Sequence, residues 1–249
     1  MRELSAARIT EAVARLCIEA NTCLPVSAEA ALRAARDAEP WPAARGILED
    51  LCSNLDIARA TRLPICQDTG LVTVFLELGQ DVHISGGGLD EAVQEGVRRG
   101  YAEGYLRKSV VRDPLRRVNT GDNTPAALKL HIVPGEGVRI TVSPKGAGSE
   151  NMCRIKMLTP AEGEEGVRRF VVDTVLAAGG NPCPPTVVGV GIGGGFDTVA
   201  AIAREALLRP VGEPNADGYY AAMERELLAE INASGLGPQG LGGRMTALA

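Results

Sequence analysis

The stretch Pro144–Pro160, which reads PKGAGSENMCRIKMLTP, constrains this chain more than any other. Gly146 and Gly148 allow a tight loop that most other residues could not make. The loop leads to Cys153, and Cys153–Leu158 is strand-like. We therefore expect a cysteine at the edge of an exposed loop, where its sulfur and the main-chain N–H groups could approach the same ligand.

Composition bounds the class of protein. The chain has 249 residues, 45% hydrophobic and 23% charged, which are ordinary values for a globular protein. Its net charge of −5 and its 3% of aromatic residues argue against nucleic acid as the main partner. The first residues carry charges throughout, and no apolar run approaches the roughly 18–20 residues of a membrane span. We expect a cytoplasmic protein that binds neither nucleic acid nor membrane.

The periodicity of apolar residues changes along the chain. In residues 1–62 the apolar residues recur at helical spacing, whereas residues 63–249 mix helical and strand-like patterns. This predicts an α+β fold in a single domain, 1–249, with a helical N-terminal segment. Ser27 is the expected N-cap of the second helix. The expected helices are Ile9–Ala20, Ser27–Pro40, Pro42–Ala60, Leu89–Leu106, Glu164–Ala178, a segment ending at Arg209, and Tyr219–Asn232.

Strand-like runs fall mostly in the middle of the chain. Asp81–Ile84 is expected to pair with Leu71–Leu78 across Gly79 and Gln80, and Thr186–Ile192 is strand-like too. Two further runs, Ala127–Val133 and Val138–Ser143, predict a hairpin around Pro134–Gly137.

A polar segment, Lys108–Ala126, separates two of these elements. Pro114, Gly121 and Pro125 interrupt it, and it is too long to be a simple connector. Loops of that length inside compact domains are usually functional.

The six cysteines fall into two groups. Three lie in or beside the helical segments among small and apolar residues and are expected to be buried there: Cys17, Cys23 and Cys52. The other three lie in turns or at strand ends bounded by proline or glycine: Cys66, Cys153 and Cys183. We expect the second group to form one site.

The pattern of these cysteines favours an iron–sulfur cluster over zinc. Zinc sites often use CxxC pairs, which the chain lacks, and His83 and His131 lie in alternating strand patterns. A [4Fe–4S] cluster on three cysteines leaves one iron open as a Lewis acid, which suits hydration and dehydration chemistry.

Two other interpretations stay open. Gly189, Gly191 and Gly194 satisfy GxGxxG between a strand-like run and a helix, as dinucleotide sites do, but no acidic residue follows at the end of a second strand. The chain could also be a non-catalytic binding or assembly subunit, in which the cysteines are structural or bind a cluster without catalysis.

Five motifs together resemble the α subunit of iron–sulfur (class I) fumarate hydratases and L-tartrate dehydratases, which is also the N-terminal domain of the fused enzymes. They occur in the family's order from Pro64 to Gly243: PICQDTG, SVVRDPLRRVNTGDNTPA, PKGAGSENMCRIKML, NPCPPTVVGVGIGG and GLGPQGLGG. The resemblance implies a hydro-lyase that acts on a dicarboxylate. The first expected substrate pair is fumarate/(S)-malate, which implies the tricarboxylic acid cycle, and L-tartrate is the alternative.

The resemblance also implies the parts of the site. It places a [4Fe–4S] cluster with one iron free of protein ligands on Cys66, Cys153 and Cys183. Its substrate contacts map to Gln67, Asp68, Gly146 and Arg107, with Arg112 as the alternative to Arg107. It assigns the general base to a β subunit, in a dimer of heterodimers, so no catalytic base is expected in this chain. Family α subunits usually continue beyond GLGGRMTALA, so C-terminal truncation is expected.

Overall fold

The computed structural model describes all residues, 1–249, and divides them into two compact units. Unit 1 comprises Met1–Leu24 and Leu55–Ala147, and unit 2 comprises Pro25–Asn54 and Gly148–Ala249. Helices and mixed sheets occur together, which confirms the α+β fold. The single-domain organisation stays a prediction. None of the helices combines the length and apolar character needed to cross a lipid bilayer.

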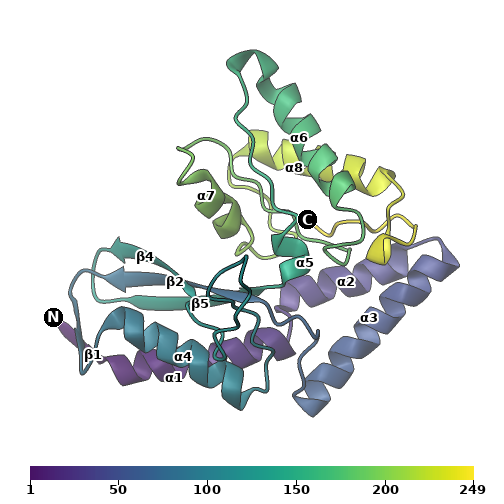
Figure 1. Cartoon of the computed structure of the whole chain (residues 1–249). Helices are drawn as coiled ribbons and strands as arrows, with labels where there is room; N and C mark the ends of the chain where they lie inside the picture. Colours follow the sequence, from purple (N-terminus) through teal and green to yellow (C-terminus); the bar gives the residue numbers. More distant parts are fainter. The chain divides into compact units, whose positions relative to one another are not determined.

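Unit 1 contains a three-stranded sheet in the order β4-β2-β5 (Figure 1). The central strand β2 (Leu71–Gly79) is parallel to β4 (Ala127–Val133) and antiparallel to β5 (Val138–Lys145). The predicted hairpin is therefore wrong, although both of its strands exist. Residues 134–137 pass over the end of β2, where the Gly79 N–H donates to the Gly137 carbonyl at 2.7 Å.

A second sheet in unit 1 pairs β1 (Arg2–Ser5) in parallel with β3 (Val82–Ser85). Two predictions are wrong here: residues 2–5 are a strand and not part of a helix, and β3 does not pair with β2. The physical reason is burial, because Leu4 of β1 joins the same apolar core as β2, while Ile84 of β3 packs against that core.

Helices α1 (Ala6–Thr22) and α4 (Leu89–Glu103) lie side by side against the sheet of unit 1 (Figure 1). Their apolar stripes form its core with strand residues: Ile9, Val13, Cys17, Val93, Val97, Tyr101, Val72 and Val74. Glycine permits the close approach of the two helices. A Cβ added at Gly100 would lie 2.7 Å from the Ala14 carbonyl oxygen.

Alanine at Gly100 should therefore destabilise the chain by about 1–3 kcal/mol, because the helices would have to separate. The matched control is Gly46→Ala, also in a helix, where an added Cβ meets no atom within 4 Å. Alanine there should be neutral or stabilise by up to about 1 kcal/mol. Urea unfolding measures both variants, and equal midpoints would contradict the close packing of α1 and α4.

Unit 2 contains most of the remaining helices. They are α2 (Val26–Ala38), the larger part of α3 (Pro42–Thr61), the single turn α5 (Ala147–Glu150), α6 (Gly163–Ala178), α7 (Val199–Ala206) and α8 (Gly218–Ala233), with 3-10 turns at Pro160–Glu162 and Pro238–Gly240. Facing residues of α6 and α8 form its core, which includes Val171, Val172, Met223, Leu227 and Ile231. The N-cap of α2 is Pro25 and not Ser27, whose hydroxyl instead accepts the N–H of Val211 at 3.1 Å.

Two strand-like runs of unit 2 do not form strands. Cys153–Leu158 has no regular structure, and Thr186–Ile192 forms only an isolated bridge, from Thr186 to Ala247. The Thr186 N–H donates to the Thr246 carbonyl at 3.0 Å. The C-terminal residues therefore pair with Thr186–Ile192 over too short a length to form a regular strand.

The GLGGRM segment of the tail is anchored to a buried carboxylate. Glu39, at the end of α2, is 1% exposed, and its Oε2 accepts the N–H groups of Arg244 at 2.7 Å and Met245 at 3.1 Å. A Cβ at Gly243 would lie 3.1 Å from the same oxygen and 2.6 Å from the Cβ of Ala44. Glycine at this position therefore lets the tail approach Glu39.

Candidate functional site

Cys66 and Gln67 lie exposed in the loop between α3 and β2 in unit 1. The Asp68 N–H donates to the Cys66 sulfur at 3.4 Å, so the loop folds back over its own cysteine. Hydrogen bonds of this kind to sulfur orient metal ligands and tune the electronic properties of the metal they bind.

Asp68 and Gly146 meet across the same part of unit 1. The carboxylate Oδ2 of Asp68 accepts the Ala147 N–H at 2.7 Å, and a Cβ at Gly146 would lie 3.0 Å from that oxygen. A hollow of about 150 Å³ opens beside them, with Cys66 and Thr69 among its lining residues. The structure thus brings three of the predicted site residues, Cys66, Asp68 and Gly146, to one place.

Arg107 follows α4, and its main chain lies against the same loop. Its carbonyl oxygen accepts the hydroxyl of Thr69, which is 3% exposed, at 3.0 Å, while the Arg107 side chain is exposed. Arg112 lies elsewhere in the polar segment, and its N–H donates to the Val118 carbonyl at 2.8 Å. The local geometry therefore associates Arg107, and not Arg112, with the Cys66–Asp68 loop.

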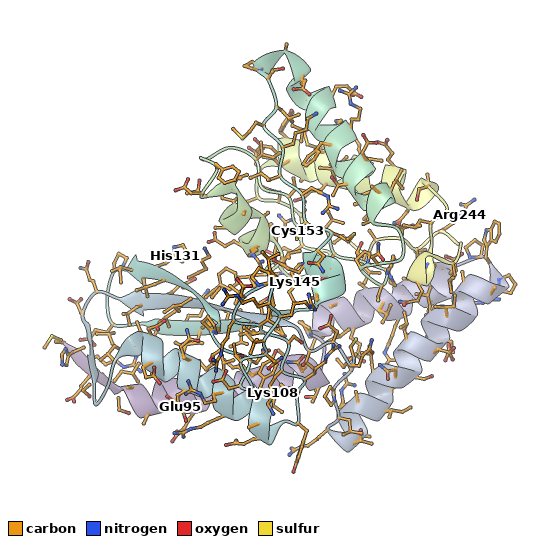
Figure 2. All side chains as sticks on the ribbon, viewed as in Figure 1. Glu95, Lys108, His131, Lys145, Cys153 and Arg244 are labelled. Carbon is orange, nitrogen blue, oxygen red and sulfur yellow. The ribbon has the colours of Figure 1, made fainter.

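The polar segment is a loop fixed by its own side chains. Asn119 donates to the Lys108 carbonyl at 2.9 Å, and Lys108 marks the start of this loop in Figure 2. Partial burial of Asp122 opposes its ionisation, but the N–H and hydroxyl of Thr124 and the guanidinium of Arg98 together lower the pKa of Asp122 to about 2. Arg98 is thus held by an ion pair inside unit 1.

Cys153 and Cys183 belong to unit 2, and the segments that carry them pack together. Cys153 is exposed just after α5 (Figure 2), and its sulfur lies 3.9 Å from the Glu150 carboxylate. Cys183 is exposed in a left-handed conformation, with φ 55°. A Cβ at Gly148 would lie 2.6 Å from the Asn181 carbonyl oxygen, so glycine permits the two segments to touch.

The other three cysteines differ in environment. Cys17 and Cys52 are buried, as expected, and Cys23 is half-buried. Burial raises the pKa of Cys17 to about 12, so its thiol stays protonated at neutral pH and is a poor metal ligand.

The three exposed thiols have the chemistry that an iron–sulfur cluster requires, because such clusters are held by cysteine thiolates. None of the six cysteines is in a disulfide. Neither unit by itself contains three His, Cys, Asp or Glu side chains grouped around a metal position. The three-cysteine ligand set stays a prediction.

The glycines of the GxGxxG pattern have a packing role. A Cβ at Gly189 would lie 2.3 Å from the Ala203 carbonyl oxygen, and one at Gly191 would lie 2.4 Å from that of Val199. Glycine is therefore required where this segment passes close to α7, which accounts for these two residues without a dinucleotide.

Three buried polar residues that support the site were missed in the sequence: Thr69, Tyr101 and Asn123. The Tyr101 hydroxyl donates to the Thr69 carbonyl at 2.6 Å, and Asn123 bonds to the main chain on both sides of the site. The run NTGDNT was a signal for Asn123 alone, because Asn, Asp and Thr side chains commonly bond to nearby main chain in loops.

Comparison with known proteins identifies relatives along nearly the whole chain. The family model for fumarate hydratase (fumerase) matches residues 10–249. A Methanocaldococcus jannaschii protein named "Putative L(+)-tartrate dehydratase subunit alpha" is 41% identical over 247 residues, covering 97% of this chain and 86% of the relative. The L(+)-tartrate dehydratase subunit alpha of Escherichia coli strain UTI89 is 33% identical over 245 residues, covering 97% of this chain and 80% of the relative.

Proposed function

The chain belongs to the fumarate hydratase family, and on that premise we propose that it is the α subunit of a hydro-lyase that dehydrates L-tartrate. The observation that carries the proposal is its similarity, over 97% of the chain, to proteins named as α subunits of L(+)-tartrate dehydratase. The sequence motifs placed fumarate first, whereas the names of these relatives favour L-tartrate. Hydration of fumarate is the second candidate, because the matching family model carries that enzyme's name.

The proposed substrate contacts are Gln67, Asp68, Arg107 and Gly146. Support comes from unit 1, where Asp68 meets Gly146 and the Arg107 main chain is bonded to Thr69. A guanidinium can hold a carboxylate by two parallel hydrogen bonds, and the side chain of Arg107 is exposed. In this proposal Asp68 accepts a substrate hydroxyl, since its carboxylate would repel that of the substrate.

We propose that Cys66, Cys153 and Cys183 hold a [4Fe–4S] cluster with one iron free of protein ligands. These are the three exposed thiols of the chain, and the buried Cys17 is unsuited because its pKa is about 12. When bound, an iron with an open position supplies a Lewis acid for the departing hydroxide. The Asp68 N–H would then hold the Cys66 sulfur in a fixed orientation beside the substrate contacts.

Loss of water also needs a base for the proton on the neighbouring carbon. We propose that a β subunit supplies it, in a cytoplasmic dimer of heterodimers. The relatives named as α subunits support the existence of a partner chain.

The test is a steady-state assay of the anaerobically purified complex with its partner subunit, using L-tartrate and (S)-malate. We expect kcat/KM for L-tartrate to be at least about tenfold higher, because a site that bonds both hydroxyls leaves a polar group unpaired with malate. The chain alone should give no turnover. A preference for (S)-malate would support the fumarate candidate instead, and full-rate turnover by the chain alone would contradict a base on the partner.

A further inference from the structure

Asn123 is a fully buried polar residue in a conformation that few residues tolerate. It is 0% exposed and has φ 63°, in the left-handed region where asparagine and glycine are favoured. It lies near the end of the polar loop, and its side chain points away from solvent into unit 1.

The Asn123 amide bonds to the main chain of two separate segments. Its Oδ1 accepts the N–H of Ser109 at 2.7 Å and that of Val110 at 3.2 Å, while its Nδ2 donates to the Gly70 carbonyl at 3.1 Å. The amide thus presents its acceptor to one segment and its donor to the other, which a carboxylate could not do because it only accepts. An aspartate of the same shape would place a carboxylate oxygen against the Gly70 carbonyl.

The two segments are those that carry the proposed substrate contacts. Gly70 follows Asp68 by two residues, and Ser109 follows Arg107 by two residues. The Thr69 hydroxyl links the same segments a second time, through the Arg107 carbonyl at 3.0 Å. A change in their spacing would therefore move the Asp68 carboxylate relative to the Arg107 main chain.

We propose that Asn123 is a positioning residue that sets the spacing between the Asp68 and Arg107 substrate contacts. The inference rests on the proposed function of those two residues. Asn123 itself does not touch the substrate. It acts through the main chain at Gly70, Ser109 and Val110, so that both contacts are in place before a dicarboxylate arrives.

The experiment compares Asn123→Gly with Gln94→Met in the cluster-loaded complex with its partner subunit. Glycine keeps the left-handed backbone and removes the amide. Gln94 is a matched control, because it is also a buried amide, with bonds to the N–H of Ala126 at 2.8 Å and to its carbonyl at 3.2 Å. It bonds to Ala126, the last residue of the same loop, and has no hydrogen bond to either substrate-binding segment.

Asn123→Gly is expected to raise KM for L-tartrate and the Kd of (R)-malate, a dicarboxylate that carries a hydroxyl for Asp68, by about tenfold each, with the Kd measured by calorimetry and kcat lowered less than about threefold. Loss of contacts made equally in the ground and transition states raises KM and leaves kcat largely unchanged. Gln94→Met should lower the melting temperature to a similar degree and leave both constants at their wild-type values. Thr69→Val, which preserves shape and removes the bond to Arg107, should raise both constants in the same direction.

Thr69→Val tests the proposal by itself if Asn123→Gly does not fold. The proposal is overturned if Asn123→Gly or Thr69→Val folds and binds (R)-malate and L-tartrate as the wild type does. It is equally overturned if Gln94→Met weakens binding as much as they do. Failure of the proposed function is seen separately, as a wild-type complex that dehydrates neither L-tartrate nor (S)-malate, and the (R)-malate Kd still tests the role of Asn123 in that case.

Discussion

Serine at Cys66, Cys153 or Cys183 is expected to abolish the visible absorbance of the reconstituted chain and to lower activity of the complex more than about 100-fold. Loss of a residue that hydrogen-bonds to a metal ligand lowers metal affinity or activity roughly 10–100-fold. Removal of a ligand itself should therefore lower them further. The absorbance is expected at about 400 nm after anaerobic addition of iron and sulfide. Each single variant should show the loss, because all three thiolates are proposed to hold one cluster.

Cys23→Ser is the matched control for these variants. Cys23 is half-buried at the end of α1, so serine there should fold, and its spectrum should equal that of the wild type. Cys17 is a poorer control, because it is 0% exposed in the core and a hydroxyl there would be buried. An unchanged spectrum in Cys153→Ser would contradict the three-ligand proposal, and loss of the spectrum in Cys23→Ser would move the ligand assignment to another thiol.

Much of the secondary structure follows from sequence periodicity. Residues of α1, α3 and α8 and of strand β2 were predicted within a few positions, because apolar residues recur at helical or strand spacing where one face meets a core. Both predicted strand pairings were wrong, since the partner of a strand depends on contacts between residues far apart in the chain. β4 and β5 are separated by only Pro134–Gly137, yet β2 lies between them.

In the candidate site, too, local features were predicted and long-range contacts were not. Local motifs marked Cys66, Asp68 and Gly146, and the structure brings these three together in unit 1. The role of Asn123 could not be read from the sequence, because it depends on bonds to Gly70, which is 53 residues away. The spacing of residues in a sequence carries no information about such long-range pairing.

Gly70→Ala is expected to destabilise the chain by about 2–5 kcal/mol, as the sum of left-handed strain and overpacking. Gly70 has φ +72°, and an added Cβ would lie 2.3 Å from the Lys145 carbonyl oxygen and 2.7 Å from the Gly146 nitrogen. Both are main-chain atoms at the end of β5, so no side-chain rotation relieves the contact. Hydrogen bonds from Tyr101 and Asn123 to the Gly70 carbonyl prevent the loop from moving away.

The matched control for Gly70→Ala is Gly137→Ala in the same unit. An added Cβ at Gly137 meets nothing within 4 Å, so alanine there should stay within about 0.5 kcal/mol of the wild type. Guanidinium unfolding of the purified chain measures both. A typical stability of about 5–15 kcal/mol means that Gly70→Ala either unfolds at much lower denaturant or loses its cooperative transition, and both results agree with the clash. A Gly70→Ala variant as stable as Gly137→Ala would show that the loop carrying Asp68 can leave the end of β5, and the pairing of Asp68 with Gly146 would then not be fixed by the fold.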